Sequence, residues 1–299
     1  MKKFLIKIIL FFAIVAGIDF ASGICFDRIV SISTTTGLGR DNHICNNGTE
    51  DILVFGSSRG LHHYNTRMMT DSLGIPCYNC SEDGQGIILN YARLRMIQQR
   101  HNPKILIYDI EPAYDIYQDD NHRYINWLKI HSNQSGIMDI ISSVDQTEKY
   151  KQVSRLYRYN SKLILLLLSL KHLNDRDDYN TGYIPLYGKL TEQQKQINPS
   201  ISSTQIDTLK LHYMESLIKS LPVTKILFVI SPAWHGKDKD YFKPIDQLCQ
   251  KYKIELIDYS DNPKYLHNDE YYNDVLHLNN IGADEFTRDI IARLKKETL

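Results

Sequence analysis

The sequence predicts an α/β fold, a doubly wound (flavodoxin-like) sandwich built on a five-stranded parallel sheet. Short apolar runs, rich in β-branched and aromatic residues and bounded by turn residues, alternate along the chain with segments of helical periodicity. The runs are almost continuously apolar, which is typical of parallel strands covered by helices on both faces. With 299 residues, of which 42% are apolar and 23% charged, the chain is long enough for one large globular domain.

The composition excludes several functional classes. Thirty-five basic residues balance thirty-five acidic ones, so the formal net charge is zero. We expect no nucleic-acid partner, because phosphate binding needs clustered Lys and Arg. Five cysteines are too few for a disulfide scaffold, and the Cys77-x-x-Cys80 pair has no second pair or histidine at zinc spacing. We expect Cys77 in the core, with a disulfide to Cys80 as the alternative, and no metal or organic cofactor.

The first 26 residues predict a hydrophobic helix that is a signal anchor or a signal peptide. Two lysines open the chain, and residues 8–18 form an uninterrupted apolar run of the length found in signal-peptide cores. Extended to residue 26, the segment is long enough to span a bilayer with Asp19 near its outer face, whereas residues 21–23 (Ala-Ser-Gly) match a cleavage site. The rest of the chain is then exported. We favour an uncleaved anchor in the inner or plasma membrane; cleavage gives a secreted or periplasmic protein.

The elements of the domain follow this segment in order. Residues 27–50, rich in Ser, Thr, Asn and Gly, predict a linker, and residues 51–299 predict the α/β domain. The expected strands are 51–56, 75–79, 104–110, 225–231 and 254–259. The expected helices between and after them are 60–73, 87–101, 205–220, 242–252 and 281–297.

A helical insertion of about residues 113–200 separates the third strand from the fourth. It contains helical patterns near 121–131 and 147–173. Within it, residues 163–170 (LILLLLSL) are strongly apolar but too few to span a membrane. We expect a buried helix there, and the alternative is a face that rests on the membrane or on a partner.

Candidate catalytic residues follow the first strand and precede the last helix. Ligands of a parallel α/β sheet gather at the carboxyl ends of its strands. Ser58 ends the Gly-Ser-Ser turn after the first strand, where a hydroxyl can act as nucleophile. Asp274 lies three residues before His277, a spacing that lets the carboxylate orient an imidazole acting as base. Each pattern alone also fits a capped turn or a solvated pair; together, in one cleft, they predict a Ser-His-Asp triad.

These blocks resemble the SGNH/GDSL hydrolase superfamily. Its first block is matched by the Gly-Ser-Ser turn that contains Ser58, and its second, an Asn followed by a Gly, by Asn79 and Gly84. Its fifth block, Asp-x-x-His, is matched by Asp274 and His277, which Leu-Asn-Asn-Ile-Gly-Ala follows as is common in such proteins. The resemblance implies that Ser58 attacks an acyl carbonyl, that Asp274 orients His277, and that the N–H groups of Ser58 and Gly84 hold the oxyanion.

The resemblance covers about residues 51–110 and 225–297 and departs from the family in one block. The third block is a Gly-x-Asn whose Asn donates to the oxyanion, but here the third strand leads to Asp109 and Glu111. An ionised carboxylate cannot donate a hydrogen bond, so two backbone donors remain. In this respect the chain is more similar to membrane-anchored, cell-envelope acyl-transfer members than to secreted lipases.

Four further residues are candidates for binding the substrate. Arg59 follows Ser58 directly and suits an anionic group, or an ion pair with the acidic residues at 82 and 83. His63 lies one turn further on, where a surface histidine is the alternative. Trp234 and His235 follow the fourth strand, where an aromatic ring can stack on a sugar or simply pack.

The sequence therefore predicts an exported serine-dependent acyl esterase or O-acyltransferase that acts on an acylated envelope or exported glycan. Its partners are then an acyl donor, a glycan or other hydroxyl acceptor and, for a transferase, a polytopic membrane protein that supplies the acyl group. The alternative is a catalytically weak or inactive relative that binds glycan. A flavodoxin-like nucleotide binder is disfavoured, because the first loop lacks the spacing of a phosphate-binding loop.

Overall fold

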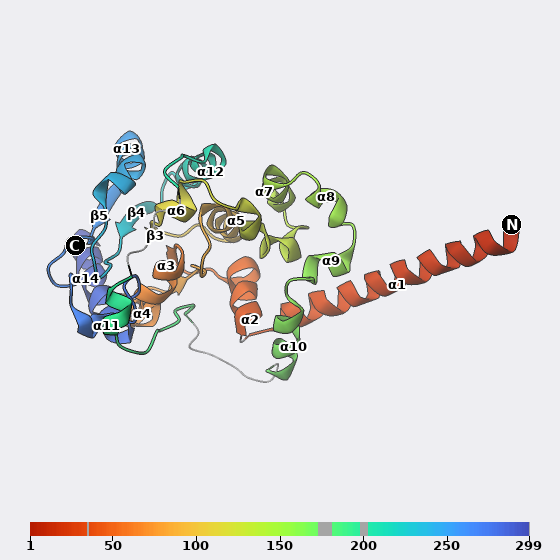
Figure 1. The fold of residues 1–299 in the computed structure, drawn as a ribbon, viewed down its shortest axis with the longest axis horizontal. Helices are drawn as coiled ribbons and strands as arrows, with labels where there is room; N and C mark the ends of the chain where they lie inside the picture. The colour runs from red at the N-terminus through yellow and green to blue at the C-terminus, as the bar shows by residue number, and fades with distance from the viewer. Residues whose placement is uncertain (35, 173–180, 198–202, 299) are drawn as a thin grey trace. The chain divides into compact units, whose positions relative to one another are not determined.

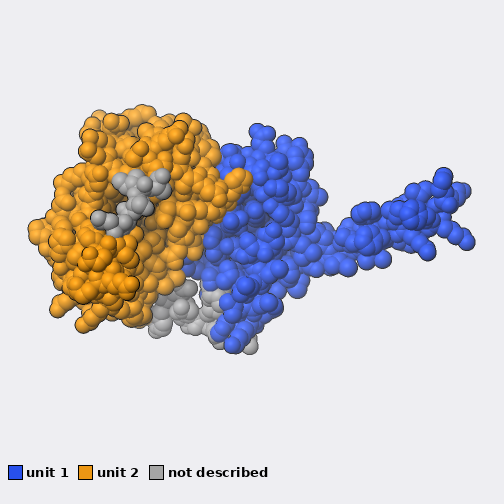
Figure 2. All heavy atoms as spheres, viewed as in Figure 1, with its two compact units in different colours: residues 1–47, 125–178 blue, residues 48–124, 179–299 orange. Residues whose placement is uncertain are grey.

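The computed structural model describes residues 1–34, 36–172, 181–197 and 203–298. The chain forms two compact units, each built from two separate segments (Figure 2). Unit 1 contains Met1–Asn47 and Ile125–Asp178, and unit 2 contains Gly48–Tyr124 and Tyr179–Leu299. The unit boundaries differ from the expected division into anchor, linker and one inserted domain, because the residues before the first strand fold together with part of the insertion.

Unit 2 is built on the predicted five-stranded parallel sheet. Its strands are β1 (Ile52–Phe55), β2 (Cys77–Asn79), β3 (Ile105–Asp109), β4 (Lys225–Ile230) and β5 (Glu255–Asp258). They pair in parallel in the order β2-β1-β3-β4-β5 (Figure 1). This is the doubly wound order with a switch point between β1 and β3. The predicted fold class is confirmed, and the strand ends lie within two residues of the expected ones.

Helices cover both faces of this sheet, with α5 and α12 on one side and α3, α4 and α14 on the other (Figure 1). The main helices are α3 (Ser58–His63), α4 (Thr66–Leu73), α5 (Ile87–Ile97), α12 (Thr208–Lys219), α13 (Lys243–Tyr252) and α14 (Asn280–Thr298). Shorter elements are α6 (Pro112–Asp115), α11 (Glu192–Lys195), η4 (Lys239–Phe242) and η5 (Asp269–Tyr271), and η2 (Asn121–Ile125) ends where unit 1 resumes.

The predicted helix over 60–73 is two helices, because Asn65 interrupts it. The Asn65 side chain accepts a hydrogen bond from the Met68 N–H (3.1 Å) and so caps α4. Its amide also donates to Asp284 on α14 (2.8 Å). The break therefore aligns α4 with α14, while α3 stays a short helix that directly follows β1.

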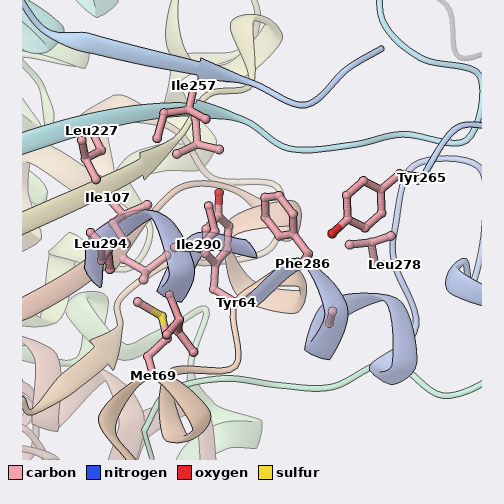
Figure 3. Packing of buried hydrophobic residues seen from close by; sticks show 14 of the residues in the cluster. Tyr64, Met69, Ile107, Leu227, Ile257, Tyr265, Leu278, Phe286, Ile290 and Leu294 are labelled. Carbon is pink, nitrogen blue, oxygen red and sulfur yellow. The ribbon is translucent and has the colours of Figure 1, made fainter. Parts of the chain in front are cut away.

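The core of unit 2 lies between the sheet and α14. Phe286, Ile290 and Leu294 project from α14 toward Tyr64, Met69 and the strand residues (Figure 3). Both Phe286 and Tyr64 are fully buried. Because α14 begins two residues after Leu278, which is also buried in this cluster, the same packing fixes the loop before the helix. Cys77 and Cys80 are buried and form no disulfide with each other.

Unit 1 is helical. It contains α1 (Lys2–Ile32), α2 (Thr36–Asn42), the π-helix η1 (His43–Asn47), the 3-10 helix η3 (Leu128–His131), α7 (Ile137–Val144), α8 (Glu148–Lys151), α9 (Arg155–Tyr159) and α10 (Leu163–Lys171). Residues 27–50, expected to be a linker, are folded here through residue 47. Ile29, Val30 and Leu38 bury their side chains in the core of unit 1. The Asn42 side chain adds hydrogen bonds to two carbonyl groups at the end of α1.

The apolar segment 163–170 forms α10, but most of its side chains are exposed. Leu166 and Ser169 are buried, whereas Ile164 is 75% and Leu167 67% exposed. The expected buried helix is therefore found as a helix with one packed face, whose main contacts with the described helices of unit 1 are with α1 and α2.

Helix α1 is long and apolar enough to cross a membrane, a test that a signal sequence also meets. It continues unbroken through residues 21–23, the match to a cleavage site. Its C-terminal part is joined to α9: the Asp19 carboxylate accepts hydrogen bonds from the Ser154 hydroxyl and from the N–H groups of Arg155 and Leu156 (2.6–3.0 Å). One turn further, Gly23 is buried against Arg155.

Candidate active site

Ser58, His277 and Asp274 form a continuous hydrogen-bonded chain in unit 2. Ser58 is the first residue of α3, and its Oγ lies 2.7 Å from Nε2 of His277. The other ring nitrogen, Nδ1, lies 2.9 and 3.0 Å from the two carboxylate oxygens of Asp274. Because an ionised carboxylate is an acceptor only, Nδ1 carries the ring proton and Nε2 is free to accept the serine proton. The His277 side chain is 21% and that of Asp274 31% exposed, so solvent reaches both.

The loop before α14 holds Asp274 in its charged form. Oδ1 of Asp274 accepts hydrogen bonds from the N–H groups of Leu276 (2.9 Å) and His277 (3.0 Å). Partial burial raises the pKa of Asp274, but the hydrogen bonds and charge of His277 and these backbone donors outweigh it, so the pKa lies below its ordinary value. The ring of His277 is thereby oriented by a carboxylate that stays ionised at neutral pH.

His63, expected in the substrate cleft, is a buried support for this loop. Its side chain is completely inaccessible, and Nε2 accepts a hydrogen bond from the Leu278 N–H (3.0 Å). Its ring also packs edge-on to His277, with 6.3 Å between the ring centroids. Burial, with further contributions from nearby cations, lowers the pKa of His63 well below its ordinary value, so the ring is neutral and can accept this bond.

The two expected oxyanion donors lie in the turns after β1 and β2. As the first residue of α3, Ser58 has an N–H without an acceptor inside the helix. Gly84 has φ +61°, a left-handed conformation that favours glycine. Among the described residues, neither N–H donates a backbone hydrogen bond. Asn79 does not join them, because its buried amide donates to the Gly60 carbonyl (2.8 Å) and accepts from the Ser81 N–H (3.1 Å).

Two ion pairs hold the turn around Gly84. Glu82 pairs with Arg93 (2.8 Å), and Asp83 pairs with His62 on α3 (2.9 Å). These two acidic residues were the expected partners of the residue after Ser58. They instead attach the turn after β2 to α5 and α3.

Arg59 pairs with the carboxylates that replace the third family block. Its guanidinium is buried, forms an ion pair with Glu111, lies 3.7 Å from Asp109 and donates to the Ile110 carbonyl (3.1 Å). Asp109 in turn accepts a hydrogen bond from the Tyr64 hydroxyl (2.7 Å). The position that supplies an oxyanion donor in the family is therefore occupied by an ion-pair network, and Arg59 is engaged by it.

Unit 2 contains a cavity of about 590 Å³ whose wall does not include Ser58, Asp274 or His277 themselves. Arg59 and Leu276, the sequence neighbours of the serine and the histidine, belong to its wall, as does His235. Aromatic rings form another part of the wall: Tyr114, Tyr241 and Phe242. Trp234 is not among the lining residues; its indole N–H donates to Asp269 (2.9 Å), and its ring packs edge-on to His235. Of the four residues expected to bind substrate, Arg59 and His235 thus reach the cavity.

Lys237 is a lining residue that the sequence did not reveal. Although the residue is only half-buried, its Nζ is inaccessible and has no hydrogen-bond partner among the described residues. Burial lowers the pKa of Lys237 to about 7, and the nearby Arg59 lowers it further, against the opposing carboxylates Asp109 and Glu111. The Tyr241 hydroxyl is likewise buried without a partner among these residues. Lys237 could have been predicted as a site residue from its position in the sequence, since it follows His235 by two residues in the loop after β4.

No protein-family model and no curated protein matches the chain. Several solved structures are similar to it. A protein assigned as an acylhydrolase from Bacteroides fragilis is 9% identical, with 86% of this chain and 94% of that chain covered and a TM-score of 0.41. A GDSL-like lipase from Bacteroides thetaiotaomicron is 6% identical (83% and 88% covered, TM-score 0.38). The periplasmic domain of a lipopolysaccharide acetyltransferase from Salmonella ser. Paratyphi A is 10% identical (88% and 90% covered, TM-score 0.39).

The fold is a doubly wound α/β fold on a five-stranded parallel sheet. Its sheet order and the positions of Ser58 after β1 and His277 before α14 agree with the resemblance noticed in the sequence. Because the identities are at most 10% and the TM-scores are below 0.5, we base the function proposed below on the side-chain geometry.

Proposed function

We propose that the chain is a serine-dependent acyl esterase or O-acyltransferase. The observation that carries this proposal is the unbroken hydrogen-bonded chain from Ser58 through His277 to Asp274. A serine used only as a helix cap needs no such chain. A histidine that bonds a serine through one nitrogen and an ionised carboxylate through the other is arranged for general-base catalysis.

The proposed reaction has two steps. As the Ser58 Oγ attacks the acyl carbonyl carbon, its proton moves to Nε2 of His277, and the resulting imidazolium is stabilised by Asp274. The imidazolium then returns the proton to the departing alcohol oxygen, which leaves an acyl ester on Ser58. In the second step water or a sugar hydroxyl gives a proton to His277 and attacks the acyl-enzyme. The Ser58 hydroxyl is regenerated in both cases.

The N–H groups of Ser58 and Gly84 are our candidates for the oxyanion hole. The family's third donor has no counterpart, since Asp109 and Glu111 follow β3 and hold Arg59. Losing one donor costs on the order of 10²–10³ in rate in other enzymes. A two-donor site suits slow hydrolysis, or transfer to an acceptor that is itself held in place.

The cavity wall suits an acylated sugar. Tyr114, Tyr241 and Phe242 offer ring surfaces on which a sugar can pack. We propose an exported or cell-envelope glycan as the acyl carrier. If the reaction is a transfer, a polytopic membrane protein that supplies the acyl group is the expected partner.

Helix α1 supports a membrane-anchored, extracytoplasmic protein. Cleavage after residue 23 would remove Asp19, whose carboxylate binds the N-terminus of α9, and would leave Arg155 without the helix it packs on. We therefore propose that α1 is retained. N-terminal sequencing of the protein from membranes should find residues of α1; a mature chain that begins near residue 24 would contradict this.

Ester turnover tests the proposed activity. The full chain in detergent should hydrolyse p-nitrophenyl acetate, and Ser58→Ala and His277→Ala should each reduce kcat by about 10³-fold or more. Ser57→Ala is a matched control, because this neighbouring serine is buried and its side chain makes no capping hydrogen bond. Equal turnover by the wild type and both triad variants would contradict the assignment of the nucleophile.

The ion-pair network in place of the third block favours one other candidate, a glycan-binding protein without catalysis. A fluorophosphonate separates the two, because it phosphonylates a serine that a neighbouring base activates. Labelling that requires Ser58 supports the enzyme. An unlabelled chain that still binds glycan would favour the binding protein.

A further inference from the structure

Unit 1 contains a second group of chemically reactive side chains, separate in sequence from the triad. Asp41 at the end of α2, Cys45 on η1 and His131 at the end of η3 are all buried, with at most 4% of each residue exposed. One ligand atom from each of them lies within 4.8 Å of the other two. We call these residues the Asp41–Cys45–His131 cluster.

The three side chains converge on one place instead of forming a relay. Oδ2 of Asp41 lies 2.7 Å from Nε2 of His131, and Oδ1 of the same carboxylate lies 3.7 Å from Sγ of Cys45. The thiol and the imidazole also interact with each other. In the triad, by contrast, the serine and the carboxylate bind opposite nitrogens of the ring.

We propose that the Asp41–Cys45–His131 cluster binds a zinc ion. Zinc is held in proteins by thiolate, imidazole and carboxylate ligands, and three such ligands leave a fourth position for water. Ligand atoms on one tetrahedral zinc are about 3–4 Å apart, so the observed separations need adjustments of about an ångström. Calcium and magnesium prefer oxygen ligands throughout, and the thiol therefore disfavours them.

The charges of the cluster balance when zinc is present. Two positive charges of the ion meet the Asp41 carboxylate and the Cys45 thiolate, while His131 is neutral. The thiol proton, and the proton shared by the imidazole and the carboxylate, are released to solvent on binding. A buried site of zero net charge avoids the large desolvation cost of an uncompensated ion.

The surroundings also suit a metal ligand set. Cys45 lies on a π-helical turn, a rare conformation that is found mostly at functional sites. The Gln134 side-chain amide lies 3.4 Å from Nδ1 of His131. Its oxygen is positioned, after a turn of the amide, to accept the N–H of a histidine that binds metal through Nε2.

A zinc ion here would join the two segments that build unit 1. Asp41 and Cys45 belong to the segment that ends at Asn47, and His131 belongs to the segment that begins at Ile125. These segments are separated in sequence by the first half of unit 2. The site is accordingly structural, and its loss should loosen unit 1 without removing the triad.

Cobalt substitution tests the site. The full chain in detergent is stripped with a chelator under reducing conditions and titrated with Co²⁺. We expect one cobalt per chain, a near-ultraviolet sulfur-to-metal charge-transfer band, and loss of that band when Zn²⁺ is added. Cys45→Ser should abolish the band, whereas Cys249→Ser, which alters a buried free thiol of unit 2, should keep it. No band in the wild type, or a band that survives Cys45→Ser, would overturn the proposal.

A second measurement needs no variant of the cluster, in case those variants fail to fold. In a Trp234→Phe background, Trp127 is the remaining tryptophan, and it packs on the core of unit 1. Its fluorescence should report a melting temperature several degrees higher with excess Zn²⁺ than with chelator. Identical transitions under both conditions would overturn the zinc site independently of the cobalt result.

Discussion

The two units of this chain each contain a buried or half-buried histidine–aspartate pair, and the pairs differ in access to solvent. His277 and Asp274 of unit 2 are 21% and 31% exposed. His131 and Asp41 of unit 1 are 5% and 1% exposed. The chemistry of the two pairs is similar, so the surroundings decide what each one can do.

Each histidine–aspartate pair contacts a third side chain, Ser58 in unit 2 and Cys45 in unit 1, and the two contacts differ. Ser58 binds the nitrogen of its histidine that faces away from the carboxylate, which leaves a path for a proton from the serine to a substrate. Cys45 and His131 both contact the carboxylate of Asp41, so the three ligand atoms face one another, which is the arrangement on which the proposed zinc site rests. A solvent-accessible histidine that lies between a serine and a carboxylate suits catalysis. A buried carboxylate that contacts both a thiol and a histidine suits metal binding.

Exchanging each aspartate for asparagine should separate the two roles most strongly. Asp274→Asn should lower kcat for p-nitrophenyl acetate by about 10⁴-fold, because the amide no longer selects the tautomer that accepts the serine proton. Asp41→Asn should leave kcat per folded molecule unchanged and should weaken metal binding instead. Steady-state kinetics, corrected for the folded fraction, measure both. Loss of turnover in Asp41→Asn would contradict the conclusion that the two aspartates have separate roles.

His63 tests how the His277–Asp274 pair is held in place, because it contacts the loop that carries His277. Replacement by leucine leaves the Leu278 N–H without its acceptor in a buried site. We expect kcat to fall by about 10- to 100-fold with little change in KM, as for a small misplacement of a catalytic base. His63→Gln, whose side-chain oxygen can accept the same hydrogen bond, should recover part of this loss. Equal activity of the leucine variant and wild type would show that the loop holds its position without His63.

Asp19 tests whether α1 is part of unit 1 or only an anchor attached to it. Asp19→Ala removes three hydrogen bonds at the N-terminus of α9. We expect a loss of about 1–2 kcal/mol and a melting temperature about 2–6 °C lower, reported by Trp127 fluorescence in the Trp234→Phe background. Asp139→Ala, at an exposed position of α7, is the control. An unchanged melting temperature of the Asp19→Ala variant would show that α1 does not contribute to the stability of unit 1 through Asp19.

Lys237 should make the stability of the folded chain depend on pH. Its pKa is about 7 in the folded chain and near 10.5 when unfolded. Between these values the unfolded chain binds more protons, so folding becomes more favourable as pH rises through this window. The melting temperature of Lys237→Met should therefore exceed that of wild type most at pH 6 and least near pH 10. Lys189→Met, at an exposed position, should show no such trend.

Local patterns in the sequence were sufficient to predict the sheet and to predict that Ser58, Asp274 and His277 lie together. The strands could be predicted because each lies in a short, largely apolar run; in β1 all four residues are buried. Ser58, Asp274 and His277 could be predicted because their places after β1 and before α14 follow from the rule that sites lie at strand ends.

The missed features depend on contacts between distant parts of the chain. Residues 27–47 have the composition of a linker, but Leu38 and its neighbours are buried by helices of the second segment of unit 1. The Asp41–Cys45–His131 cluster has no motif spacing, since its histidine follows Asp41 by 90 residues.

The most direct test of the central claim is the site at which a fluorophosphonate attaches. The full chain in detergent is incubated with the probe, and the intact mass and the labelled peptide are determined by mass spectrometry. We predict one adduct per chain, located on Ser58, strongly slowed in His277→Ala and absent in Ser58→Ala. An unlabelled wild-type chain, or an adduct on another residue, would contradict the claim that Ser58 is an activated nucleophile.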